Sequence, residues 1–326
     1  MTEARVPPAA DRWLAAVHGL SPTPREDRER LVGRREALDI LGCDPGRLDV
    51  LVREGLPVAG AGAGGPLFDF HDLINVGLYS GSGASLGESG ERVLMRFAAQ
   101  PPERWTGGRR WALQVEHRCP AGPAPGAWSA ARPAPEFVGG LCERWDPVGS
   151  DTGDRLGLEG EVWVTGRSRS VVAHALRDLY AEWLADVRAE RLRFQWLPPS
   201  LRRDPERAHA LRVTDCVAAS LMLERRARSL GFEARTRKGH LLGLICVEHA
   251  WAEARDADGA WKPVDPILPL VAQRAGALQP EFEEFCLGST SNRVVPWDRG
   301  AGEDLATHAC GAGAGVVSTV TGGAAR

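Results

Sequence analysis

Lysine, long apolar runs and paired cysteine motifs are what this sequence has least of. Lys238 and Lys262 are its only lysines, so 40 − 2 = 38 basic residues are arginines, which is typical of a GC-rich bacterial genome. No apolar run approaches the roughly 18 residues that span a bilayer, and the first residues, MTEARVPPAADRW, contain no apolar signal core. The sequence therefore predicts a cytoplasmic protein with no membrane partner.

The cysteines lack the spacing of a zinc-binding motif. Seven cysteines occur at positions 43, 119, 142, 216, 246, 286 and 310, and none forms a Cys-x-x-Cys pair. Such pairs are the usual sign of a structural zinc site. The HExxH, P-loop and dinucleotide-binding motifs are also absent. We therefore expect no metal and no cofactor, and we expect most thiols to be reduced and buried.

What is present suits a globular protein of about two domains. The chain has 326 residues, of which 43% are hydrophobic and 25% charged, and its formal net charge of −3 does not favour a nucleic-acid partner. The changes in pattern along the chain predict five segments. These are a loose leader (1–30), a helical module (31–81), a β-rich region of uncertain type (82–165), a core of helices and strands (166–300) and a flexible Gly/Ala-rich tail (301–326).

The helical module begins with two short helices. Asp44 can cap the second of them, with Pro45 at its first position, and a glycine-rich hairpin then leads to a third helix after Asp69. This order, carried by REALDILGCDPGRLDVLVREGL, the glycine-rich wing and FDFHDL, resembles the winged helix-turn-helix of the MerR and excisionase families. The resemblance covers about fifty residues and implies a winged module over residues 31–81.

The charge of this module does not suit DNA. Residues 31–80 contain four arginines (34, 35, 47, 53) and seven acids (36, 39, 44, 49, 54, 69, 72), a net charge of 4 − 7 = −3. Phosphate neutralisation supplies most non-specific DNA affinity. We therefore expect a protein, peptide or carrier partner, or a purely structural role, and we do not expect tight DNA binding.

The residue types of a cysteine-based active site occur in the second half of the chain. RVTDCVAASLMLERRARSLG predicts a helix that starts at Cys216, where the positive end of the helix dipole favours a thiolate. A strand-like FEART, a turn at Lys238–Gly239 and the strand HLLGLICVEHAWAEA follow. After the DADG turn, a further strand ends at Asp265, so that His249 and Asp265 come from adjacent antiparallel strands. Such a pair can hold and orient a proton for a nucleophile.

These blocks also resemble the transglutaminase-like superfamily. The resemblance covers roughly residues 170–270 and is carried by Cys216 at a helix start, GFEAR, HAW and DGAWKPVDP. It implies an α+β fold with a papain-like core and acyl transfer through a thioester. It also implies a triad in which Cys216 is the nucleophile, His249 the general base and acid, and Asp265 the orienting residue. The residues TDC differ from those that usually precede the family's cysteine. The Cys216 N–H would be one oxyanion donor, and Trp183 and Trp196 are both candidates for the second.

Taken singly, each residue has a simpler interpretation. Cys216 could be a packed thiol, His249 a core histidine, and Asp265 a turn former before Pro266. Their order and spacing favour an enzyme acting on a peptide or small-molecule acyl substrate, by hydrolysis or by amide formation in a biosynthetic pathway. The alternative is a helix-turn-helix regulator or adaptor whose core binds a peptide without turnover. The complete triad and the acidic module favour the enzyme.

Overall fold

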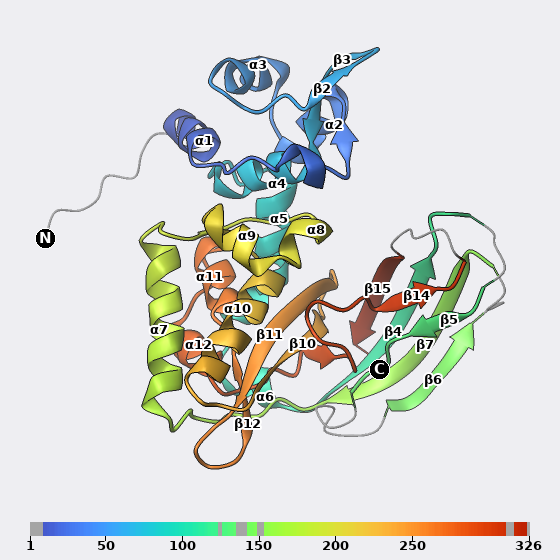
Figure 1. The fold of residues 1–326 in the computed structure, drawn as a ribbon, viewed down its shortest axis with the longest axis vertical. Coiled ribbons are helices and arrows are strands. Elements are labelled where there is room, and N and C mark those ends of the chain that lie inside the picture. Colours follow the sequence, from blue (N-terminus) through green and yellow to red (C-terminus); the bar gives the residue numbers. More distant parts are fainter. Residues whose placement is uncertain (1–8, 123–125, 135–141, 149–152, 311–315, 325–326) are drawn as a thin grey trace, which may run out of the picture. The chain divides into compact units, whose positions relative to one another are not determined.

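The protein is an α+β protein, as the sequence predicts. The structure, a computed structural model, describes residues 9–122, 126–134, 142–148, 153–310 and 316–324. It divides into unit 1 (residues 1–92 and 186–218) and unit 2 (residues 93–185 and 219–326). Helices and mostly antiparallel sheets make up both (Figure 1). Within the described ranges, no helix combines the length and the apolar character needed to cross a membrane.

Unit 1 consists of short helices around a three-stranded sheet of order β1-β3-β2 and a parallel pair, β8-β9. Its elements are α1 (Ala9–His18), the 3-10 helix η1 (Arg25–Asp27), β1 (Leu31–Val32), α2 (Arg34–Leu41), α3 (Pro45–Arg53), β2 (Gly60–Gly62), β3 (Gly65–Asp69), α4 (Phe70–Tyr79), the start of α5 (Leu86–Leu94), β8 (Arg193–Phe194), α8 (Pro199–Arg202), α9 (Pro205–Ala210) and β9 (Val213–Thr214).

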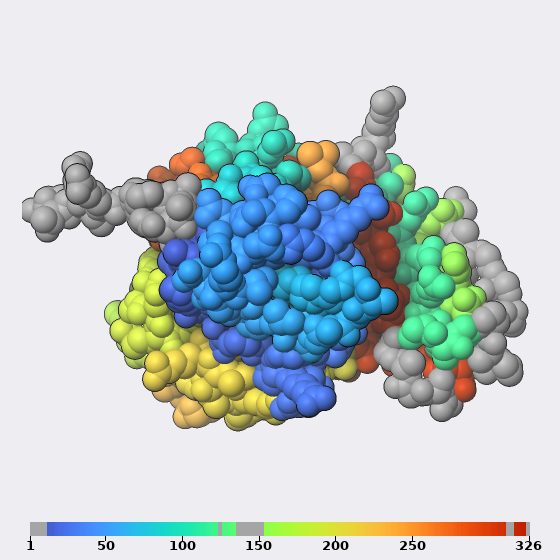
Figure 2. Space-filling view, turned by 90° about the horizontal axis from the view of Figure 1, so that it is seen from above, coloured from blue at the N-terminus to red at the C-terminus, as the bar shows by residue number. Residues whose placement is uncertain are grey.

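Local capping explains where the helices of residues 31–80 begin and end. The Asp44 side chain accepts the Arg47 N–H at 2.9 Å at the start of α3, and Asp69 caps α4 in the same way. Gly42, with φ of 62°, ends α2 in the left-handed conformation that glycine adopts without strain. The helices and the hairpin expected from the sequence are therefore confirmed. Figure 2 looks onto the surface of these residues, drawn in blue.

The leader is more ordered than the expected loose segment, although its first eight residues lie outside the described ranges. It contains helix α1, which buries Trp13, Ala16 and Val17 along one face. Further on, Asp72 of α4 accepts hydrogen bonds from the N–H and the hydroxyl of Thr23 at 2.8 and 2.9 Å. The apolar face of α1 and the buried carboxylate of Asp72 therefore hold this segment in place, although its proline and charge content is typical of a loose one.

Unit 2 contains two four-stranded antiparallel sheets, of order β15-β4-β7-β6 and β12-β11-β10-β13, and the pair β14-β5. Its elements are the end of α5, the 3-10 helix η2 (Met95–Phe97), α6 (Glu103–Thr106), β4 (Arg109–Arg118), β5 (Trp128–Ala130), β6 (Cys142–Val148), β7 (Arg155–Val164), most of α7 (His174–Arg188) and of α10 (Cys216–Ser229), β10 (Ala234–Leu241), β11 (Val247–Arg255), β12 (Trp261–Val264), α11 (Ile267–Arg274), α12 (Pro280–Phe285), β13 (Val294–Pro296), β14 (Ala306–His308) and β15 (Val317–Ala324).

The two sheets of unit 2 share buried side chains. Trp111 and Leu113 of β4 and Val162 of β7 lie in one apolar cluster. The cluster also contains Leu242, which follows β10, and Val295 of β13. The expected β-rich region therefore exists from residue 109 onward. Its first part, residues 86–106, is helical instead, because α5, η2 and α6 bury Met95, Phe97 and Trp105 at helical spacings. Residues 123–125, 135–141 and 149–152 of this region lie outside the described ranges.

The carboxyl-terminal segment differs from the expected flexible tail. Ala306–His308 forms β14, which pairs with β5, and Val317–Ala324 forms β15, which pairs with β4 along its whole length. Val320 lies opposite Val115 and is buried. The alternation in VVSTVT is a strand pattern that the surrounding glycines obscure. Residues 311–315 and 325–326 lie outside the described ranges.

Candidate active site

Cys216 is the first residue of α10, directly after the short strand β9. The neighbouring residue Asp215 caps this helix: its Oδ1 accepts the Ala218 N–H at 2.9 Å, and its Oδ2 accepts from Arg202 Nε at 2.8 Å. The same guanidinium donates from Nη2 to Cys216 Sγ at 3.8 Å. Cys216 is buried, with 9% of its surface exposed. Its sulfur thus lies at a helix N-terminus and beside a guanidinium group.

His249 and Asp265 meet as the sequence predicts. His249 lies on β11, and Asp265 directly follows β12, which pairs with β11 in antiparallel register. His249 Nε2 and Asp265 Oδ2 are 2.6 Å apart, and both side chains are buried. The other oxygen, Oδ1, accepts the N–H groups of Ile267 and Leu268 at 3.1 and 3.3 Å. The first turn of α11 thus fixes the carboxylate that orients the imidazole.

The imidazole is also held from its face. The Trp251 ring stacks on His249 at a centroid distance of 5.8 Å and an interplanar angle of 20°. Trp251 Nε1 donates to Glu253 Oε1 at 3.2 Å, and Glu253, which has no exposed surface, accepts from Arg235 Nε at 2.8 Å. The alternating HAWAE pattern places these three side chains on one face of β11. The sequence predicts Trp251 only as a core residue and does not predict Glu253.

One expected turn is wrong. Lys238–Gly239 lies inside β10, and the chain reverses only at residues 242–246, between β10 and β11. Gly239 is opposite His249 in the sheet, and a Cβ there would lie 2.6 Å from the Val295 carbonyl oxygen and 2.9 Å from the Trp251 ring. Close approach of the Val295 carbonyl oxygen and the Trp251 ring, not a turn, therefore requires the glycine.

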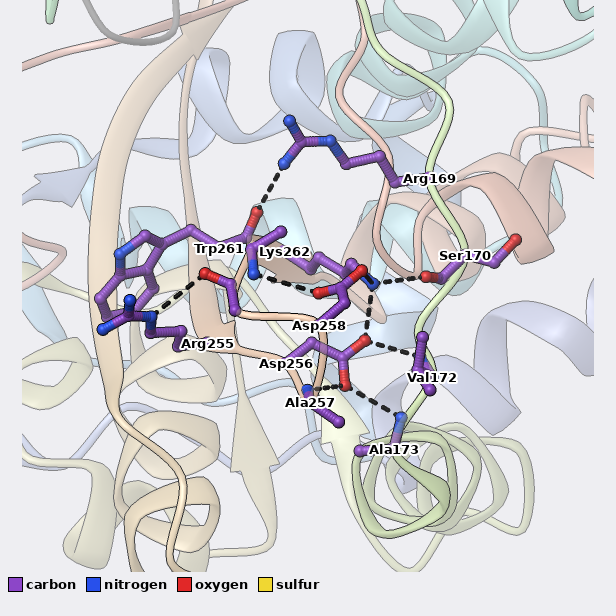
Figure 3. Close-up of polar contacts among 12 residues, drawn as sticks. Arg169, Ser170, Val172, Ala173, Arg255, Asp256, Ala257, Asp258, Trp261 and Lys262 are labelled. Atoms are coloured by element: carbon purple, nitrogen blue, oxygen red, sulfur yellow. Dashed lines mark hydrogen bonds and ion pairs between the residues drawn. The ribbon is translucent and has the colours of Figure 1, made fainter.

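The hairpin between β11 and β12 is locked by a buried lysine (Figure 3). Lys262 Nζ donates to Asp256 Oδ2 at 2.7 Å, to Asp258 Oδ2 at 2.6 Å and to the Ser170 carbonyl oxygen at 2.7 Å. Asp256 also accepts the N–H groups of residues 172 and 173, and these bonds, with the one from Lys262, lower its pKa to about 2 against the opposing effect of burial. Lys262 and Asp256 together hold the segment before α7 against the hairpin that leads to Asp265.

His249 and Asp265 line a pocket within unit 2. Its other walls are mainly apolar, with a short run of hydroxyl side chains, and comprise Thr165, Trp251, Pro263, Leu268, Phe282, Phe285, Cys286, Ser289, Thr290, Ser291, Val294 and Pro296. Burial, with the nearby Asp265 carboxylate, raises the pKa of the Cys286 thiol well above its usual range. Cys286 is therefore a poor nucleophile, although it lies beside the histidine pocket.

The structure thus brings two of the three expected catalytic residues together. His249 and Asp265 form a hydrogen-bonded pair in unit 2, while Cys216 belongs to unit 1. Of the two candidates for a second oxyanion donor, Trp183 is buried in α7, and its Nε1 has no hydrogen-bond partner among the described residues. Trp196 is 37% exposed and belongs to unit 1. Neither lines the pocket.

Comparison with known proteins adds little. No protein-family model matches the chain, and no curated protein matches its sequence. A solved structure from Cytophaga hutchinsonii, described as a "putative cysteine protease", is similar over 68% of this chain and 92% of its own, with 10% sequence identity and a TM-score of 0.31. Likeness at this level assigns neither a family nor an activity to this protein.

The pocket of His249 and Asp265 offers no set of metal ligands. Among the described residues, the one group of three or more His, Cys, Asp or Glu side chains that could hold a metal ion is Cys119, His308 and Cys310. The spacing of the cysteines gave no reason to expect it, and the sequence led us to expect no metal.

Proposed function

We propose that this protein catalyses acyl transfer through a thioester on Cys216. In this mechanism the Cys216 thiolate attacks an acyl carbonyl, His249 protonates the leaving group, and Asp265 keeps the imidazole oriented. His249 then takes the proton of the incoming water or amine, which attacks the thioester and frees the thiol. We assign the surrounding core to the transglutaminase-like superfamily on the sequence blocks that carry that resemblance.

The observation that carries this proposal is the buried pair of His249 and Asp265. A carboxylate that accepts at 2.6 Å from Nε2 fixes the ring plane, so that a nucleophile would use Nδ1. Trp251 on the ring face restricts the imidazole further. A core histidine that only satisfies its hydrogen bonds does not need a carboxylate anchored by two backbone N–H groups. The arrangement is typical of a general base held ready for proton transfer.

The surroundings of Cys216 support its part in the chemistry. Asp215 and Arg202 form an ion pair at 2.8 Å beside the helix start, and Arg202 also reaches the sulfur. The backbone N–H of Cys216, at the first position of α10, can act as one oxyanion donor. Burial raises the pKa of the Cys246 and Cys286 thiols. They are therefore weaker candidates.

The acyl acceptor decides between hydrolysis and amide formation. The apolar side chains of the pocket, including Trp251, Phe282 and Phe285, suit an acyl chain or an apolar peptide side chain and limit water. We therefore propose a peptide or small-molecule acyl donor, with transfer to an amine as the favoured outcome. For residues 31–81 we propose a winged module that docks a protein or carrier partner.

Thiol labelling tests the nucleophile without knowledge of the substrate. Brief treatment with limiting iodoacetamide, followed by peptide mass spectrometry, should label Cys216 first. The rate at near-neutral pH should fall sharply in His249→Gln. Cys246→Ser, a half-buried cysteine in unit 2, is the matched control and should leave the rate unchanged. First labelling of another cysteine would overturn the assignment.

Intact-mass trapping tests the acyl-enzyme itself. Incubation with a panel of acyl thioesters and activated esters should give a mass increase equal to the acyl group, mapped to Cys216 and absent from Cys216→Ala. Addition of a primary amine should then release amide faster than water releases acid. If no donor in the panel acylates Cys216 while the labelling result holds, the adaptor interpretation, in which the core binds peptide without turnover, replaces the enzyme.

A further inference from the structure

Two cysteines and a histidine from distant parts of the sequence meet at one end of the sheets of unit 2. Cys119 directly follows β4, His308 is the last residue of β14, and Cys310 lies two residues further on. One possible ligand atom from each residue lies within 4.8 Å of the others. None of the three has a part in the proposed acyl transfer.

Backbone hydrogen bonds hold all three residues in place. The Cys119 N–H donates to the Asp154 carbonyl oxygen at 2.7 Å, which fixes the end of β4. His308 lies opposite Trp128 in the β14-β5 pair, and the Trp128 ring stacks on the imidazole at 4.4 Å and 19°. The Cys310 N–H donates to the His308 carbonyl oxygen at 2.9 Å. The three side chains therefore converge on a scaffold that needs no rearrangement to bring them together.

The separation of the sulfur atoms suits a shared cation. Cys119 Sγ and Cys310 Sγ are 3.5 Å apart, far beyond the roughly 2.05 Å of a disulfide bond. Two thiolates bound at about 2.3 Å to a tetrahedral zinc ion would lie about 3.8 Å apart. The observed distance is close to that value, and small side-chain rotations would close the difference.

The histidine supplies an independent observation. Both ring nitrogens of His308 are buried, and neither has a hydrogen-bond partner among the described residues. Buried polar atoms without a partner cost free energy, and each such case in a folded protein needs an explanation. Stacking on Trp128 does not satisfy a nitrogen lone pair. A bond to a cation beside the two sulfurs would satisfy one of these nitrogens.

We propose that Cys119, His308 and Cys310 bind a zinc-class divalent cation, with water or an exogenous ligand in the fourth position. Two sulfurs and one imidazole nitrogen form a donor set that suits zinc, whereas calcium and magnesium prefer oxygen donors. Binding forms two metal–sulfur bonds and one metal–nitrogen bond, and both thiol protons leave to solvent. The cation would join the end of β4 to His308, the last residue of β14, and to Cys310, and so stabilise the ends of these strands.

Cobalt titration of the full-length, metal-stripped and reduced protein tests the site directly. Thiolate-to-cobalt charge-transfer absorption should grow to one equivalent, and zinc should then displace the cobalt and remove the band. Cys119→Ser and Cys310→Ser should each lose the tight, one-equivalent phase, and His308→Gln should weaken binding at least tenfold. Cys43→Ser and Cys246→Ser are the matched cysteine controls and should bind as the unmodified protein does.

Thermal unfolding provides a second test. Because zinc would bind the folded protein more tightly than the unfolded chain, the midpoint should rise with zinc concentration and fall again with a chelator. The same zinc should not shift the midpoint of Cys119→Ser. A folded, reduced protein without the cobalt band would overturn the proposal. A cobalt band that persists in the Cys119→Ser/Cys310→Ser double variant would also overturn it. So would a disulfide between Cys119 and Cys310, seen as a mass two hydrogens below that of the reduced protein, if the reduced protein then binds no metal.

Discussion

Residues 31–80 of unit 1 and the sheets of unit 2 are stabilised in different ways. In residues 31–80, carboxylates such as Asp44 and Asp69 bind N–H groups two or three residues away at helix starts. In unit 2, the bonds that matter join distant segments, such as Lys262 to Ser170 and β15 to β4. Loss of one cap in unit 1 should therefore remain local, whereas loss of one partner in unit 2 should disturb the elements that carry His249 and Asp265.

The largest effect is expected at His249 and Asp265 of unit 2, the proposed catalytic pair. Asp265→Asn should lower the rate of acyl transfer by about 10²–10⁴-fold, because an amide cannot hold the same imidazole tautomer. Its oxygen can still accept the N–H groups of Ile267 and Leu268, so the fold should remain intact. The loss should be smaller than that of Cys216→Ala, which removes the nucleophile.

The matched control for Asp265→Asn is Asp258→Asn, on the same hairpin, whose side chain is 45% exposed. Turnover of a donor found by trapping, or the alkylation rate of Cys216, measures both. Equal rates for Asp265→Asn and Asp258→Asn would contradict the role of Asp265.

The next largest effect concerns the buried lysine of the hairpin. Lys262→Met should lower the free energy of unfolding by about 3–5 kcal/mol, because Asp256 would remain buried without its cation. The Lys262 and Asp256 side chains are 2% and 0% exposed. Urea denaturation measures the loss, and Asp256→Ala/Lys262→Met should recover part of it. A loss below about 1 kcal/mol would mean that the pair behaves as a surface ion pair.

The difference between local and long-range contacts also explains which features could be predicted from the sequence. Asp44, Pro45 and Asp69 signal helix starts through neighbours in the chain, and the helices of residues 31–80 lie where these residues indicate. His249 and Asp265 could be paired because a short hairpin joins their strands. Contacts across long separations left no such signal. The Cys119, His308 and Cys310 cluster and the pairing of β15 with β4 belong to this class.

Acid should destabilise unit 2 more than helix α4 of unit 1. Burial lowers the pKa of His117 and of His240 in unit 2 to about 4, so the unfolded chain binds more protons between pH 6.5 and 4. Stability of unit 2 is thus present above pH 6.5 and lost as pH falls. In α4, burial raises the pKa of Asp72 to about 6, which adds stability as pH falls through 6, while burial lowers the pKa of the neighbouring His71, which removes stability as pH falls. The two shifts in α4 therefore oppose each other.

Hydrogen exchange by mass spectrometry at pH 7 and pH 5, corrected for intrinsic rates, can resolve this difference. Each histidine should cost roughly 1–2 kcal/mol of protection in β4 and β10 over that interval, while α4 should lose less, because its two shifts oppose each other. His240→Gln, which can still accept from Trp297 Nε1, should remove its share of the loss. Equal loss of protection in α4 and β10 would contradict this difference.

A smaller effect is expected from a single cap in unit 1. Asp44→Ala should cost about 1 kcal/mol, because the Arg47 N–H loses its partner at the start of α3. Faster exchange should be confined to α3 and its neighbours. Asp39→Ala, an exposed acid within α2, serves as the control and should change exchange little. Faster exchange throughout unit 1 would show that the capped helices are more strongly coupled than their local bonds indicate.

The smallest effect should be on DNA. Two of the seven acids of residues 31–80, Asp69 and Asp72, are buried, so four arginines face five solvent-accessible acids, and Arg34 is already bonded to Asp49 at 2.6 Å. A surface that is close to neutral releases few counterions from a duplex, so binding should be weak and nearly independent of salt. Fluorescence anisotropy of a labelled duplex, titrated with the full chain at low and physiological salt, measures this.

Asp39→Arg/Asp49→Arg, which raises the net charge by four, should bind more tightly and with a steeper salt dependence. Sub-micromolar, salt-sensitive binding by the unmodified protein would instead assign residues 31–80 to DNA binding.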